Sequence, residues 1–151
     1  MIERDPAVIN LFAHSKVLQG LNAEITDKIR IIEADALEWH PGEAVDFLYA
    51  DIWRTLEEPQ TLDDVRRMQA NVAAGSIYFW GQELCIHALA GQSPQSGADA
   101  AQWKEAVRRC IDDRIALPLL WPAGLDYPEF INNVVSLRRK RWPIGIPDVA
   151  R

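Results

Sequence analysis

The sequence holds few of the residues that mark metal sites or disulfide frameworks. Its two cysteines, Cys85 and Cys110, lie far apart and lack the paired spacing of zinc ligands. The three histidines, His14, His40 and His87, show no metal-binding spacing either. We therefore expect no metal site and no disulfide, and the scarcity of cysteine suits a reducing cytoplasm.

Positively charged residues are also few. The 16 Lys and Arg residues are outnumbered by 22 Asp and Glu residues, so the formal net charge is -6. Because affinity for nucleic acid comes mainly from cations that neutralise phosphates, a nucleic-acid partner is not expected. The one compact basic run, residues 138–141, is interpreted as a solvated helix end, where cations complement the helix dipole, in preference to a binding patch.

Long hydrophobic runs are missing as well. No apolar run reaches the length of a membrane span, and charged residues follow Met1 and Ile2 at once, where a signal peptide would have its apolar core. The chain of 151 residues is long enough for one core and too short for two ordinary domains. We expect a soluble protein with a single domain over residues 1–151.

Short apolar runs that alternate with amphipathic stretches are present. Runs at residues 29–34, 44–52 and 76–80 predict strands, and the middle run is apolar enough for a strand buried on both faces of a parallel sheet. Strands that alternate with helices predict an α/β fold with a mostly parallel sheet and flanking helices. The expected helices lie at residues 6–17, 61–73, 82–89 and 98–117 and from Asp126 onward.

Polar residues and glycines predict where these helices begin and end. Asp5 and Asp126 stand where a side chain can cap the first turn of a helix, and Thr61 is expected to cap the helix that follows it. Gly75 is expected to end that helix. Residues 18–28 are interpreted as a connection.

Acidic residues stand at the ends of three expected strands. Glu3 ends a two-residue stub, Asp35 follows the run at 29–34, and Asp51 lies at the end of the run at 44–52. In open α/β sheets, ligands bind beyond the carboxyl ends of the strands, so these positions favour a binding site. Asp51 is the most unusual, because a carboxylate that ends a strongly apolar strand needs a partner or water.

The order of these segments resembles class I S-adenosylmethionine (SAM)-dependent methyltransferases, and among them the spermidine-synthase-like branch. The matching segments are residues 2–9 (IERDPAVI), 31–36 (IIEADA) and 45–53 (VDFLYADIW). They cover about the first third of the chain, and the run at 76–80 matches loosely. The resemblance implies a Rossmann-like sheet, SAM as cofactor and a transferase activity.

The resemblance also implies cofactor-binding residues. Glu3 is similar to the position whose carboxylate binds the two ribose hydroxyls, and Arg4 belongs to the same segment. Asp35 is similar to the position that binds the adenine amino group, and the backbone N–H of Ala36 would face a ring nitrogen. Each acidic residue has a structural alternative, because Glu3 stands beside a helix start and Asp35 is placed to cap a turn.

Asp51 and Trp53 are the catalytic candidates that the resemblance implies, since they would lie near the sulfonium and the methyl acceptor. In the alternatives, Arg54 only neutralises Asp51, and Trp53 is a core residue, as we favour for most tryptophans. The segment at 51–54 (DIWR) differs from the Asn-Pro-Pro-Tyr pattern of amino-methylating members. It also lacks the second acidic residue of polyamine recognition, so the acceptor stays open.

One part of the family pattern is missing, because the first strand and its glycine-rich turn should precede Glu3. We therefore expect weak or absent SAM binding and an apolar opening between Ile2 and Val45. A rearranged sheet, a partner chain or further sequence could fill this opening, and a homodimer is the simplest association. Two functions follow: a SAM-dependent methyltransferase of unknown acceptor, or a non-catalytic module of the same fold that acts in homodimer assembly or regulation.

Overall fold

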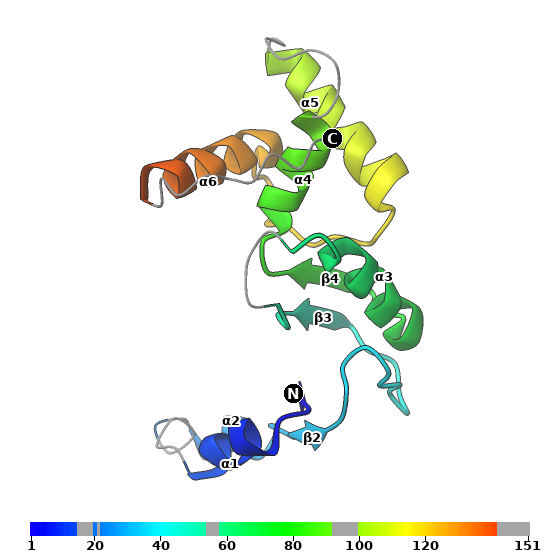
Figure 1. The fold of residues 1–151 in the computed structure, drawn as a ribbon, viewed down its shortest axis with the longest axis vertical. Coiled ribbons are helices and arrows are strands. Elements are labelled where there is room, and N and C mark those ends of the chain that lie inside the picture. Colours follow the sequence, from blue (N-terminus) through cyan, green and yellow to red (C-terminus); the bar gives the residue numbers. More distant parts are fainter. Residues whose placement is uncertain (15–19, 21, 54–57, 92–99, 142–151) are drawn as a thin grey trace.

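The computed structural model describes residues 1–14, 20, 22–53, 58–91 and 100–141. These residues form a mixed α/β chain with short parallel strands (Figure 1). In Figure 1 the N-terminal elements lie at one end, β3, β4 and α3 lie in the middle, and α4, α5 and α6 lie at the other end. The elements in chain order are β1 (Ile2–Glu3), α1 (Pro6–His14), α2 (Ala23–Thr26), β2 (Ile32–Glu33), β3 (Phe47–Ala50), α3 (Thr61–Val72), β4 (Ser76–Phe79), α4 (Gln82–Gly91), α5 (Ala100–Arg109), a π-helical segment (Cys110–Ile115) and α6 (Tyr127–Arg141).

The N-terminal sheet has two parallel strands, β1 and β2. Ile2 lies opposite Ile32 and Glu3 opposite Glu33. The N–H of Ile32 donates to the carbonyl of Met1 at 2.9 Å, and the next bond of the ladder runs from the residue after Glu33 to Glu3 at 3.1 Å. The strand expected at residues 29–34 is therefore confirmed in direction but is only two residues long.

The second sheet pairs β3 with β4, again in parallel. Phe47 lies opposite Ser76, and the pairing continues for four residues of each strand. The far side of β4 is also occupied, because Ile77 forms a parallel bridge with Leu119. β3 is thus the open edge of this sheet within the described ranges.

The α/β class and the parallel pairing of the expected strands are confirmed, but the expectation of one mostly parallel sheet is wrong. Within the described part of the chain, the strands form two separate two-stranded sheets, β1 with β2 and β3 with β4. The two sheets do not join because β1 and β3 each pair with a strand on one side only, and a cavity lies between these two strands. The gap between the two sheets therefore lies between β1 and β3, where the sequence predicted an apolar opening.

The core consists of two clusters of buried side chains. One lies where α3 covers β3 and β4, and the other joins α4, the π-helical segment and α6. Leu117 and Leu119 pack against both clusters and so connect them. Fully buried members include Val65, Ile77 and Phe79 in the first cluster and Ile86, Ile115 and Ile131 in the second.

Helix α3 differs from its expected ends. Thr61 is its first residue and not its cap, and its buried Oγ1 has no hydrogen-bond partner among the described residues. The helix ends at Val72, and the next residue, Ala73, adopts a left-handed conformation with φ 50° and donates its N–H to the carbonyl of Gln69 at 2.8 Å. Gly75 has a different role, because a Cβ there would lie 3.3 Å from the carbonyl oxygen of Asp46 across the sheet.

The last helices agree better with the expectations. The helix expected over 98–117 is α5 followed by the π-helical segment, and it ends at Ala116, another left-handed residue. Asp126 caps α6, where its Oδ1 accepts the N–H of Glu129 at 3.4 Å. The basic run at 138–141 forms the end of α6. No helix in the described ranges combines the length and the apolar character needed to cross a membrane.

Candidate functional site

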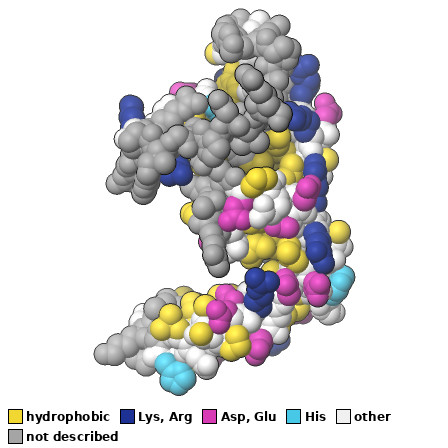
Figure 2. Space-filling model, viewed as in Figure 1, with side chains coloured by type: hydrophobic (Ala, Val, Ile, Leu, Met, Phe, Trp, Pro, Cys, Tyr) yellow, Lys and Arg dark blue, Asp and Glu magenta, His cyan; other side chains and the backbone are white. Residues whose placement is uncertain are grey.

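A cavity of about 430 Å³ lies between the two sheets. Ile2 and Glu3 of β1 border it on one side, Ala36 follows β2, and Leu48 and Asp51 border it on the side of β3. Figure 2 shows the molecule hollowed between its N-terminal elements and the larger part above them. Residues at or shortly after the ends of three different strands therefore meet at one hollow.

Three of the six residues singled out in the sequence line this cavity. They are Glu3, Ala36 and Asp51. Arg4 and Asp35 are the chain neighbours of two of these residues and contact each other. The sixth residue, Trp53, does not line the cavity and is described below.

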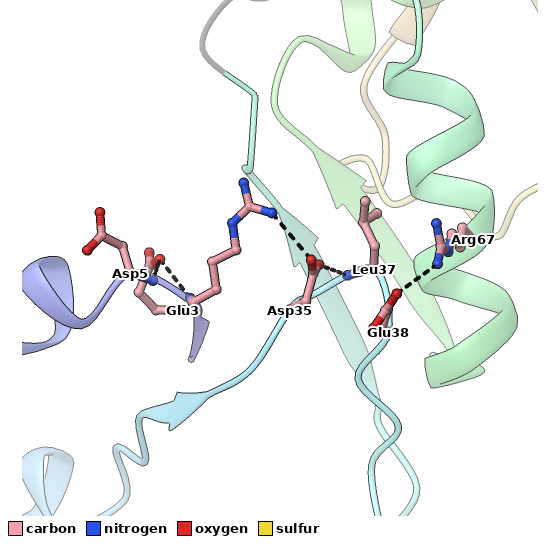
Figure 3. Close-up of polar contacts among 7 residues, drawn as sticks. Glu3, Asp5, Asp35, Leu37, Glu38 and Arg67 are labelled. Atoms are coloured by element: carbon pink, nitrogen blue, oxygen red, sulfur yellow. Dashed lines mark hydrogen bonds and ion pairs between the residues drawn. The ribbon is translucent and has the colours of Figure 1, made fainter.

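Glu3 is tied to the chain segment that leads into α1. Its Oε1 accepts the backbone N–H groups of Arg4 and Asp5, each at 2.8 Å (Figure 3). Asp5 in turn accepts the N–H of Ala7 at 2.8 Å and caps α1. These contacts match the structural interpretation of Glu3, and they occupy one of its two oxygens. Among the described residues, its Oε2 has no hydrogen-bond partner.

Asp35 is engaged through both oxygens. Its Oδ1 accepts the N–H of Leu37 at 2.9 Å, which forms a turn after β2. Its Oδ2 lies 3.3 Å from Nη1 of Arg4, so the pair joins the segments after β1 and β2 (Figure 3). Exposed ion pairs contribute about 0–1 kcal/mol, so this pair orients Asp35 more than it stabilises the fold. A ligand that donates to Oδ2 must share it with Arg4 or displace Arg4.

Asp51 is exposed and lies beside an aromatic pair. The hydroxyl of Tyr49 donates to its Oδ2 at 3.4 Å. The ring of Tyr49 stacks on Tyr78, with centroids 6.0 Å apart and planes at 11°. Burial, followed by the negative charge of Asp51, raises the pKa of Tyr49, so this phenol stays protonated at neutral pH. Arg54, the alternative partner of Asp51, lies outside the described residues.

Trp53 points into the core. Its side chain is buried, and its indole N–H donates to Oδ2 of Asp64 on α3 at 2.9 Å. Its ring meets the ring of Phe79 edge-on at 6.4 Å. The core interpretation therefore holds for Trp53, and the aromatic side chains that line the cavity are Trp39 and Tyr49.

A buried polar network, which the sequence did not predict, lies just beyond β4. Glu83 is 6% exposed and accepts the hydroxyls of Tyr78, at 3.2 Å, and Tyr127, at 3.1 Å. The hydroxyl of Tyr127 also accepts from Nε2 of Gln82 at 2.7 Å. Burial, followed by the charge of Glu83, raises the pKa of Tyr78 to about 12, and burial raises the pKa of Tyr127 as well. One sequence signal could have pointed to this network: Glu83 follows the strand β4, as Asp51 follows β3.

The described ranges contain neither a metal-binding cluster nor a disulfide. Within them, no group of three or more His, Cys, Asp or Glu side chains is placed to hold a metal ion. Cys85 and Cys110 are free thiols, and burial raises the pKa of Cys85 to about 11, which keeps it protonated.

Comparison of the chain with known protein families, with characterised proteins and with solved structures finds no match.

Proposed function

We propose that the chain is a SAM-dependent methyltransferase-like protein of unknown acceptor, with a Rossmann-like ancestry and a nucleoside subsite at the cavity between the two sheets. The subsite, here called the polar mouth, consists of Glu3, Asp35, Ala36 and Asp51. The observation that carries the proposal is that residues at or shortly after the ends of three different strands line one cavity. Ligands of open α/β sheets bind at such strand ends.

The residues of the polar mouth fit the nucleoside half of SAM. Glu3 would bind the ribose hydroxyls through Oε2, and Asp35 would accept from the adenine amino group. The backbone N–H of Ala36 would donate to a ring nitrogen. A cavity of about 430 Å³ also falls within the usual range of ligand sites, about 300–1,000 Å³.

The described residues offer no comparable binding site for the amino-acid half of SAM. Glycines with positive φ allow a close backbone approach to a ligand, but Gly81 and Gly124 lie outside the cavity lining. We therefore propose weak binding of SAM. The cofactor, when bound, supplies an electrophilic methyl group.

Asp51 and Trp53 have different parts in this proposal. Asp51, held by Tyr49, would orient the methyl acceptor and is the catalytic candidate. Trp53 is a positioning residue, since its bond to Asp64 anchors the segment after β3 to α3. The free thiols of Cys85 and Cys110 suit the reducing cytoplasm that we propose as the location.

Calorimetric titration with S-adenosylhomocysteine and with adenosine tests the proposal. We expect weak binding of both ligands, and the Asp35→Ala and Glu3→Gln variants should abolish it. Glu33→Gln is the matched control, because Glu33 lies opposite Glu3 in the ladder but does not line the cavity. Absence of binding at millimolar ligand, or binding that survives Asp35→Ala, would overturn the nucleoside subsite.

A second candidate function, a non-catalytic module that assembles as a homodimer, is favoured by one observation. Phe47 and Tyr49 alternate with inward-facing residues of β3 and are 45% and 52% exposed. Burial of such aromatic side chains stabilises interfaces. Sedimentation equilibrium should then give a dimer that Tyr49→Lys converts to monomer, and a monomer at all concentrations contradicts this function.

A further inference from the structure

The open edge of β3 carries backbone groups that point away from its one neighbouring strand. Asp46 and Ala50 accept N–H groups from the β4 side, at 3.0 and 2.9 Å. Alternate residues of a strand in a parallel ladder direct their hydrogen-bonding groups to opposite edges. The N–H and C=O groups of Phe47 and Tyr49 therefore face away from β4, toward the side on which β3 has no described partner strand.

A second open edge borders the same cavity. In β1, Met1 and Glu3 accept the N–H groups of the β2 side, at 2.9 and 3.1 Å. By the same alternation, the backbone groups of Ile2 face away from β2. Ile2 lines the cavity together with Leu48 and Tyr49 of β3. The cavity therefore lies between two strand edges, and each edge has backbone groups that no described strand uses.

The edge of β3 also lacks the usual protection against strand pairing. Natural edge strands are guarded by inward charges, prolines or bulges. The four residues of β3 are Phe-Leu-Tyr-Ala, with the charged Asp46 and Asp51 only at the two ends. Phe47 and Tyr49 are exposed. No described strand pairs with this edge, so within the described ranges it is open to a further strand.

The size of the cavity fits a short extended segment. One strand residue fills about 160 Å³ when strands lie about 4.8 Å apart, rise about 3.3 Å per residue and belong to layers about 10 Å apart. A cavity of about 430 Å³ thus holds about three residues. Three residues span the stretch from Phe47 to Tyr49.

We propose that this cavity receives an extended strand of a separate polypeptide, with an apolar side chain at every second position. The strand pairs with the free groups of Phe47 and Tyr49. Its apolar side chains meet Met68 and Val72 of α3, which line the cavity. The proposal requires no nucleoside, because the polar mouth lies at the strand ends and the pairing groups lie along the edges.

Two other occupants fit less well. The C-terminal segment of the chain, residues 142–151, contains Pro143 and Pro147, and proline is poorly suited to a strand with neighbours on both sides. A folded second copy fits less well, because a cavity of about 430 Å³ holds about three residues and not a folded surface.

Amide hydrogen exchange, followed by NMR on the full chain, tests the proposal. The probe is a capped seven-residue peptide of alternating valine and threonine. When the peptide is present at about ten times its dissociation constant, its binding should slow amide hydrogen exchange at Phe47 and Tyr49 by about tenfold. The N–H of Glu33 is the internal control, because it faces the outer edge of β2 and should not change.

A control peptide and two protein variants distinguish strand pairing from nonspecific binding of the peptide. The same peptide with N-methyl groups at alternate residues cannot pair and should give no protection. Tyr49→Pro removes one edge donor and should abolish protection, whereas Tyr49→Val keeps the donor and should retain it. Equal protection by the methylated peptide, or none by either peptide at millimolar concentration, overturns the proposal. Protection without peptide that grows with protein concentration identifies a second copy as the occupant and also overturns it.

Discussion

Replacement of Tyr78 by phenylalanine tests the buried network beyond β4 through the alkaline stability of the fold. The pKa of this phenol rises from 10.0 to about 12 on folding, because of burial first and the charge of Glu83 second. The unfolded chain therefore loses its proton first as the pH rises. Stability that Tyr78 contributes is complete below about pH 10 and is lost between about pH 10 and about pH 12.

The size of this effect follows from the shift. One pKa unit corresponds to about 1.36 kcal/mol, so a shift of about two units sets an upper limit of about 2.7 kcal/mol. Tyr78 is only half-buried, and solvent screening reduces the expected loss to about 1–2 kcal/mol. Tyr127, whose pKa is also raised, adds a loss of the same sign.

Urea denaturation followed by tryptophan fluorescence measures this loss at a series of pH values. Tyr78→Phe should flatten the fall in the free energy of unfolding above about pH 10, because the variant has no phenol to ionise there. Tyr49→Phe is the comparison variant and should flatten the fall less, because Tyr49 is exposed and its pKa is raised less than that of Tyr78. An alkaline fall that is equally steep in wild type and Tyr78→Phe would contradict this prediction.

Three further predictions concern stability and are measured by urea or thermal unfolding. Phe79→Ala should cost about 3–5 kcal/mol because Phe79 is fully buried, whereas Ile32→Ala, at an exposed position, should have a small effect. Ala73→Gly should stabilise the fold by about 1 kcal/mol, because glycine adopts the left-handed conformation without strain. A hydrogen bond from Lys104 lowers the pKa of Asp126, so stability should fall as the pH drops below about 4, and Asp126→Asn should weaken this dependence.

The sequence predicted features that depend on neighbouring residues. Helix positions followed from apolar periodicity, and the caps at Asp5 and Asp126 followed from side chains that bind N–H groups two or three residues onward. The grouping of Glu3 and Asp51 at one cavity followed from a general rule, that strands of one parallel arrangement present their carboxyl ends together.

Features that depend on distant residues were not predicted. The Glu83 network joins side chains 44 and 45 positions apart, and no local pattern marks Tyr127 as the partner of Gln82 and Glu83. The left-handed Ala73 and Ala116 carry no sequence signal, because alanine disfavours the conformation that these two helix ends adopt. The burial of Trp53 likewise depends on Asp64 of another element.

The distribution of buried side chains implies unequal local stability along the chain. Among the described residues, none before Ala50 is buried, and the two-stranded pairing of β1 with β2 has no core of its own. A two-stranded unit without a hydrophobic face is marginal in water, so this third of the molecule should open far more often than the rest. Whatever fills the cavity then also orders the N-terminal elements, and protease cleavage before Ala50 reports its occupancy.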